Sequence, residues 1–158
     1  MSATADGHNG QLAAPAHLVA DADLPWVPSG TPGKSSKPLR FMGERGFVEM
    51  LRMEPGTVMP LHRHTGEVHV LHLAGERLLS SGERVGPGDY VFEPAGNVDW
   101  WKVVGEETLV ALVVVMGEVE FLGPGGEVRF TASAATQRTA YEKHCERNGL
   151  AVKRLTDV

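Results

Sequence analysis

The sequence predicts an all-β protein, a sandwich or barrel of short strands followed by one α-helix near the C-terminus. Short apolar runs recur at intervals of roughly eight to twelve residues, which is the spacing of strands in all-β folds. Turn residues separate these runs, and 19 glycines and 10 prolines in 158 residues favour strands joined by tight turns. Only one later segment has the residues of a capped helix.

The first 37 residues are predicted to form a flexible arm that contains one docking segment. Residues 1 to about 23 are small and polar, as in mobile chain termini. In Leu24–Pro28 a tryptophan, Trp26, lies between two prolines, and such an extended segment suits docking on a surface. Residues 29–37 are rich in Gly, Pro, Ser and Lys, and we expect a flexible connector there.

Residues 38–132 are predicted to form the β-domain. Each expected strand is a short apolar run between turn residues such as Gly, Pro and Asn. The run from Leu109 to Met116 is apolar on both faces, as expected for a strand buried between two layers. The expected strands are Leu39–Met42, Phe47–Met53, Thr57–His64, Val68–Leu73, Glu76–Ser80, Tyr90–Glu93, Asp99–Val104, Thr108–Met116, Val119–Leu122 and Glu127–Thr131.

Residues 133–158 are predicted to form a C-terminal helix and tail. Ser133 can cap the N-terminus of the helix, because its hydroxyl can accept a hydrogen bond from a free backbone N–H. Asn148-Gly149 suits a left-handed stop about fifteen residues later. Tyr141 and Cys145 are expected on the inner side of this helix.

Composition and charge narrow the classes of function. The net charge of -5 argues against nucleic acid as a partner, since phosphate binding requires a basic surface. No run of about 18 apolar residues is present, so we expect no membrane span. The N-terminus lacks the layout of a signal peptide, and the single cysteine, Cys145, fits a reducing compartment. We therefore expect a cytoplasmic protein.

Two glycine-bounded segments carry the residues with metal-binding chemistry. In the first, His62 and His64 are separated by one residue, so both point to the same face of a strand. Imidazole is a ligand for zinc, iron, copper and nickel. About thirty residues later a second segment ends with Asp99 before two tryptophans. We predict a metal site made by His62, His64, His69 and Asp99.

The two segments resemble the two signature motifs of the cupin superfamily, whose members are double-sheet jelly rolls that can hold a metal and a small molecule. The first motif has Gly, five residues, His-x-His, three or four residues, Glu, and a later Gly. Gly56, His62, His64 and Gly75 match it, and His69 takes the place of the glutamate. The resemblance implies a jelly-roll barrel over about residues 38 to 131.

The second cupin motif has Gly, five residues, Pro-x-Gly, two residues and His. Gly88, Pro94 and Gly96 match it, and Asp99 takes the place of the histidine. Two interpretations follow from this departure. Asp99 replaces the histidine and completes two histidines and a carboxylate, the set found in ferrous oxygenases. Alternatively the site has lost its catalytic metal and only binds a ligand.

Three further features resemble a narrower group of cupins, similar to 2,4'-dihydroxyacetophenone dioxygenase and the acetylacetone-cleaving dioxygenase. These are His62–His69, Glu93–Gly96 and Leu24–Pro28. Such enzymes use ferrous iron and O2 to cut a carbon–carbon bond next to a carbonyl. The resemblance implies an oxidoreductase that takes a hydroxy-ketone or β-diketone and O2. It implies Fe2+ as the cofactor, with Zn2+, Ni2+ and Mn2+ as alternatives, and a homodimer.

Two other functions stay open at this point. One is a non-catalytic ligand-binding or sensor cupin, which the departure at Asp99 motivates. A site closed by four protein ligands would leave no open position for a substrate, as in structural zinc sites. The other is an isomerase or lyase cupin that uses the metal without O2.

The remaining predictions rest on strand parity for His69, His72 and Trp101, and on closeness to the second motif for Glu93. His69 is expected to face inward, either as a ligand or as a lining histidine bonded to a backbone carbonyl. His72 lies three residues further and should face away. Trp101 shares parity with Asp99 and is expected either to shape the pocket against a substrate or to be plain core. Glu93 is expected to orient a ligand histidine or to bond the adjacent turn.

Overall fold

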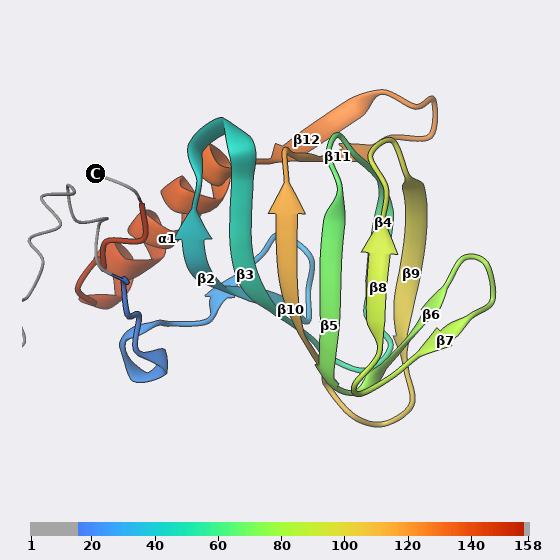
Figure 1. Cartoon of the computed structure of the whole chain (residues 1–158), viewed down its shortest axis with the longest axis horizontal. Coiled ribbons are helices and arrows are strands. Elements are labelled where there is room, and N and C mark those ends of the chain that lie inside the picture. The colour runs from blue at the N-terminus through green and yellow to red at the C-terminus, as the bar shows by residue number, and fades with distance from the viewer. Residues whose placement is uncertain (1–15, 157–158) are drawn as a thin grey trace, which may run out of the picture.

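Two antiparallel sheets face each other and form a barrel in the computed structural model, which describes residues 16–156 (Figure 1). Residues 1–15 of the predicted flexible arm therefore lie outside the described residues. In spatial order, the first sheet consists of β1 (Val27–Pro28), β2 (Lys34–Phe41), β3 (Gly46–Met53), β10 (Leu109–Met116), β5 (Val68–Ala74) and β8 (Tyr90–Glu93). The second consists of β12 (Val128–Ala132), β11 (Val119–Leu122), β4 (Val58–His64), β9 (Val98–Val104), β6 (Glu76–Leu79) and β7 (Arg84–Val85).

The helices are few and short apart from the last one. The 3-10 turn η1 (Asp21–Asp23) precedes β1, a second one, η2 (Gly43–Arg45), connects β2 to β3, and α1 spans Ala134–Asn148. This arrangement confirms the predicted all-β jelly roll with a C-terminal helix. No helix among residues 16–156 has the length and apolar character needed to span a membrane.

The connector predicted over residues 29–37 is wrong in its second half. Strand β2 begins at Lys34, and its residues pair with β3 in a register that sets Lys34 opposite Met53. Backbone pairing with β3 overrides the polar composition that suggested a flexible segment. The docking segment precedes it: Val27 pairs with Ser36, and the Trp26 ring lies under the Arg52 guanidinium at 4.3 Å.

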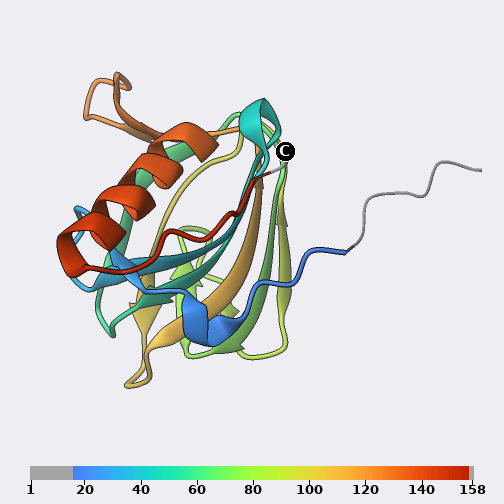
Figure 2. The same ribbon diagram turned by 90° about the vertical axis from the view of Figure 1, so that its left-hand side faces the viewer.

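Helix α1 closes the side of the barrel next to β1, β2 and β12 (Figure 2). Its N-terminus has a reciprocal capping box, in which the Ser133 hydroxyl accepts from Thr136 N–H and the Thr136 hydroxyl accepts from Ser133 N–H. It ends at Gly149, whose φ of 65° is left-handed. Tyr141 and Cys145 are buried under the helix, as predicted.

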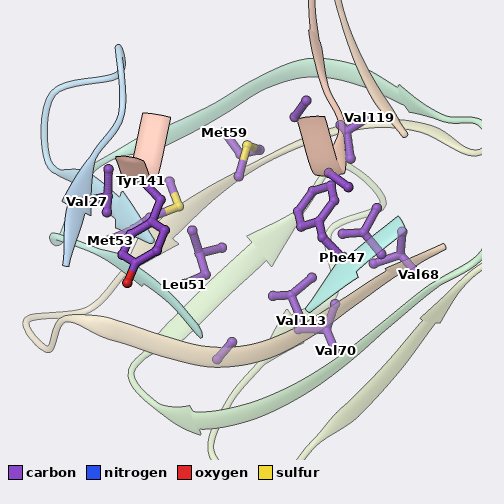
Figure 3. Packing of buried hydrophobic residues seen from close by; sticks show 14 of the residues in the cluster. Val27, Phe47, Leu51, Met53, Met59, Val68, Val70, Val113, Val119 and Tyr141 are labelled. Carbon is purple, nitrogen blue, oxygen red and sulfur yellow. The ribbon is translucent and has the colours of Figure 1, made fainter. Parts of the chain in front are cut away.

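The apolar core lies between the two sheets (Figure 3). Alternate residues of each strand point inward, so that Phe47 and Leu51 of β3 face Met59 of β4 across the barrel. Val68 and Val70 of β5 belong to the same cluster. The inward faces therefore combine apolar side chains with the polar groups described next.

Candidate metal and ligand site

A cavity of about 240 Å³ lies inside the barrel between the two sheets. Apolar side chains of the strands, including Val70, Leu109 and Val113, line part of its wall. Polar side chains are grouped toward two places in its wall. We call the first group the histidine end, made by His62, His64, His72, Arg77 and Glu93. We call the second group the lysine end, made by Lys34, Glu49 and Gln137.

A bulge in β4 turns both predicted histidines into the cavity. The pairing of β4 with β9 shifts register between Met59 and His62, so Met59 and His62 both face inward although they are three residues apart. Pro60 lies within the bulge, where its missing N–H breaks no ladder bond. His62 and His64 are only 2% and 4% exposed, and their ring centroids lie 4.9 Å apart.

Hydrogen bonding leaves these two imidazoles with nitrogens free to act as ligands. His62 Nδ1 donates to the Pro60 carbonyl oxygen at 2.7 Å, which leaves its Nε2 as the lone-pair nitrogen. Burial lowers the pKa of His62, which favours the neutral form that binds metals. Among the described residues, neither nitrogen of His64 has a hydrogen-bond partner. A buried polar group without a partner calls for an explanation, and a bound ion would supply one.

A buried ionic network stands beside the histidine pair. Glu93 Oε2 lies 3.4 Å from His64 Nε2, and Glu93 Oε1 lies 3.6 Å from an Nη1 of Arg77. Burial alone would raise the pKa of Glu93, but its interactions with the nearby His64, Arg77 and His62 together outweigh burial and lower that pKa. The carboxylate therefore stays ionised and lies where it can orient His64.

Arg77 is 2% exposed and is held by groups from three strands. Its Nε donates to His72 Nε2 at 2.9 Å, and His72 Nδ1 donates to the Asp89 carbonyl oxygen at 2.9 Å. The guanidinium lies 4.6 Å from the ring centroid of Trp101. Within residues 16–156, Nη2 of Arg77 has no hydrogen-bond partner. It is a buried, fixed cation with one free donor group beside the histidines.

Trp101 lies where strand parity predicted. It is 4% exposed and lines the cavity, whereas Trp100 on the other face of β9 is 43% exposed. The Trp101 ring forms part of the apolar wall of the cavity, and the Arg77 guanidinium packs over it. Its predicted place in the pocket wall agrees with this geometry.

Asp99 lies on the inner face of β9 but does not line the cavity. Its Cα is paired in register with that of His62 on the neighbouring strand. Its Oδ1 accepts a hydrogen bond from the Ser80 hydroxyl and another from the Trp100 N–H. The carboxylate is therefore beside the histidine pair along the sheet, and local hydrogen bonds hold it.

The structure does not bring His69 to the other predicted ligands. It lies on the outer face of β5, where it hydrogen-bonds Tyr90 at 2.5 Å and Glu67 at 3.1 Å. The expectation that His72 faces away is also wrong, because His72 is buried and lines the cavity. Val68, Val70 and His72 share the inner face, so the prediction started from the wrong parity.

The donor set fits a metal ion in part. In the described part of the chain, no three His, Cys, Asp or Glu side chains are already grouped as a metal site. His62 and His64 fit as a ligand pair by their spacing, burial and free nitrogens. The carboxylates of Glu93 and Asp99 are close by, but other side chains hold them.

Sequence reasoning missed the polar residues that complete the cavity wall. Arg77 has a polar and an apolar neighbour in a short strand, so its sequence context predicts an exposed arginine. Lys34 and Glu49 are likewise charged residues on strands. The one available signal was strand parity. Glu49 shares a strand face with the apolar residues Phe47 and Leu51, which indicates that it points inward.

A double-sheet barrel with a histidine pair on one inner strand defines the chain as a cupin. Residues 14–120 match the ChrR Cupin-like domain, so the chain belongs to that family. No sequence among the curated proteins matches this chain.

Solved structures show the same fold. An RmlC-like cupin protein from Ralstonia eutropha JMP134 superposes with a TM-score of 0.84 at 22% identity, covering 89% of this chain and 94% of that chain. A protein of unknown function with a cupin-like fold from the same organism gives 0.82 at 18% identity, covering 93% and 96%. An acetylacetone dioxygenase from Acinetobacter johnsonii gives 0.72 at 15% identity, covering 87% and 98%. At these identities the likeness concerns the fold alone.

Proposed function

We propose that this cupin is a metal-dependent dioxygenase that cleaves a carbon–carbon bond of a small carbonyl compound, such as a hydroxy-ketone or β-diketone. The observation that carries the proposal is the buried pair His62 and His64, which line the cavity beside the fixed Arg77 guanidinium. Among the described residues the two nitrogens of His64 have no hydrogen-bond partner, and His62 Nδ1 bonds Pro60, which leaves Nε2 as the lone-pair nitrogen. The fold shared with an acetylacetone dioxygenase is consistent with this chemistry. Fe2+ is the proposed ion, because two histidines and a carboxylate form the usual ferrous oxygenase set.

His62, His64 and Asp99 would hold the ion. Asp99 is the better carboxylate ligand because its partners are a neutral hydroxyl and an amide, whereas Glu93 is already paired with the Arg77 cation. Ligation by Asp99 requires it to give up its bond with Ser80. Glu93 instead orients the His64 ring through its oxygen 3.4 Å from Nε2. When bound, the ion supplies a site for O2 and polarises a carbonyl as a Lewis acid.

Side chains of the cavity would bind the organic substrate. The enolate of a carbonyl compound, formed by loss of the acidic C–H proton, carries negative charge on oxygen, and Nη2 of Arg77 can donate a hydrogen bond to it. Arg77 is held in place by His72 and Trp101, so little side-chain entropy is lost on binding. The apolar wall of Val70 and Val113 excludes water from the ligand.

Metal analysis with O2 uptake tests this proposal. The purified chain is expected to hold about one equivalent of iron and to consume O2 with an active β-diketone or hydroxy-ketone. The His62→Ala/His64→Ala variant should lose the metal. His69→Ala is the matched control, since His69 lies on the outer face and its loss should leave the metal content unchanged.

The carboxylate variants separate the proposed roles. Asp99→Asn should reduce the metal content, whereas Glu93→Gln should leave the metal bound and lower the turnover. Equal metal content in the wild type and the double histidine variant would refute the site. Full metal retention in Asp99→Asn would remove Asp99 from the ligand set.

A second function, a non-catalytic ligand-binding cupin, is favoured by one specific observation. Both nearby carboxylates are engaged by other groups, Asp99 by Ser80 and Glu93 by Arg77. A barrel in that state offers two histidines and a guanidinium for binding, without a completed metal site. Ligand affinity that is the same with and without metal, together with no O2 uptake, would identify this function.

A further inference from the structure

The lysine end of the cavity carries polar groups that the proposed reaction does not use. Lys34 comes from β2, Glu49 from β3 and Gln137 from helix α1, and all three line the same cavity as the histidines. Two consecutive strands and a helix that lies much later in the chain thus converge on one place. Helix α1 covers this side of the barrel (Figure 2).

Lys34 has weak partners for a cation in a cavity wall. In the part of the chain that the structure describes, its Nζ lies 3.8 Å from the Met59 sulfur and 5.1 Å from the Phe121 ring centroid. Burial lowers the pKa of Lys34, and the charge of Glu49 opposes that shift. A thioether and an aromatic ring leave the ammonium able to donate to an incoming oxygen.

Glu49 is the complementary group. One carboxylate oxygen, Oε2, accepts a hydrogen bond from Gln137 Nε2 at 3.0 Å. Burial raises the pKa of Glu49, and Lys34, Gln137 and Ser36 act against the shift. An ionised carboxylate has about four lone-pair sites, so it can accept further hydrogen bonds from a ligand.

We propose that Lys34 and Glu49 form a second subsite that binds a neutral hydroxyl group, alcoholic or phenolic, of the ligand. A hydroxyl both accepts a hydrogen bond, here from Lys34, and donates one, here to Glu49. A ligand carboxylate would be repelled by Glu49, and a ligand amine would be repelled by Lys34. The pair therefore selects a group that is uncharged and has both hydrogen-bonding roles.

The subsite adds to the proposed function by naming a second feature of the substrate. The carbonyl part would bind at the histidine end and the hydroxyl at the lysine end. An apolar skeleton would lie against Val113 and Val70, which follow Glu49 in register across β10 and β5. A cavity of about 240 Å³ suits a ligand smaller than a typical drug molecule. This assignment rests on the proposed function only for the carbonyl part, since hydroxyl binding needs no metal.

Four matched aromatic probes test the subsite on the full-length, chelator-treated protein. Phenol offers a donor and an acceptor, anisole offers an acceptor alone, benzoate is an anion and benzylamine is a cation. Ligand-observed NMR titration should show phenol binding about tenfold or more tightly than each of the others, the ratio that one net hydrogen bond supplies. In Lys34→Met and in Glu49→Gln the preference for phenol over anisole should fall to about twofold or less.

Lys37→Met is the matched control. Lys37 is also a buried lysine of β2, but it pairs with Asp21 at 2.6 Å and lies outside the cavity wall. This variant should keep the preference for phenol. Thermal melts check that each variant folds, and either cavity variant alone decides the question if the other does not fold.

Three results would overturn the subsite. Equal affinities for phenol and anisole would show that the site does not recognise a hydroxyl as a hydrogen-bond donor. Tighter binding of benzoate would make the lysine end an anion site. A phenol preference that survives in both variants would place hydroxyl recognition elsewhere in the cavity. Because the protein is metal-free, none of these results bears on the iron proposal, and loss of iron binding would not affect this test.

Discussion

The two ends of the cavity hold buried charges in different ways. At the histidine end, Arg77 contacts His72, Glu93 and Trp101 at once, so one guanidinium fixes three neighbours. At the lysine end, the contacts of Lys34 among residues 16–156 are with the Met59 sulfur and the Phe121 ring, and Glu49 is bonded chiefly to Gln137 of the covering helix. The first arrangement is preorganised for one geometry. The second leaves hydrogen-bonding capacity for a ligand, at a cost in stability.

The largest expected effect comes from breaking the fixed end. Arg77→Met leaves the buried Glu93 carboxylate without its cation, so the free energy of unfolding should fall by about 3–5 kcal/mol. Urea denaturation measures this loss. A fall of under about 1 kcal/mol would mean that the network is not the rigid element of the barrel.

The double variant Arg77→Met/Glu93→Gln sharpens that result. Removing both charges takes away the unpaired carboxylate, so part of the lost stability should return. A double variant that is less stable than Arg77→Met would show that Glu93 stabilises the barrel through groups other than Arg77.

A smaller effect is expected from loosening the covering helix. Ser133→Ala removes the hydroxyl that caps Thr136 N–H, and the free energy of unfolding should fall by about 1 kcal/mol. Phenol binding at the lysine end should weaken, because Gln137 lies in the first helical turn. Iron content should not change. An equal effect on both ends would contradict their independence.

The smallest effect concerns pH. Burial raises the pKa of Glu49 above its usual 4.5, so between 4.5 and the folded-state value the folded protein holds a proton that the unfolded chain has lost. The wild type therefore loses stability as pH rises through this window. Glu49→Gln has no proton to lose, so its stability relative to wild type should increase over the same window and stay constant below it. Thermal melts from pH 4 to 8 test the sign.

Local patterns in the sequence predicted most of the fold. Strand runs and glycine turns depend on neighbouring residues, so their positions, the C-terminal helix and its Ser133 cap agree with the structure. The inward pair His62 and His64 also follows from alternation within one strand. The homodimer and the cytoplasmic location stay predictions.

What the sequence could not predict depends on parity between strands and on distant contacts. A shift of one residue exchanges the two faces of a strand, which is why His69 and His72 were assigned to opposite faces from those observed. The bond from Ser80 to Asp99 joins the turn after β6 to β9, and no local pattern in the sequence predicts it. Arg77 is buried through partners on other strands, so its charge alone suggested an exposed position.

The bulge in β4 makes one strand serve both ends of the cavity. Met59, before the bulge, touches the Lys34 ammonium, and His62, after it, belongs to the histidine pair. The extra residue changes which residues of the strand face inward, so the side chains before and after the bulge follow separate alternations. A regular strand of the same length would keep Met59 inside and turn both imidazoles outward, whereas deleting one residue of the bulge would restore one-to-one pairing with β9 and keep Met59, His62 and His64 on the same face.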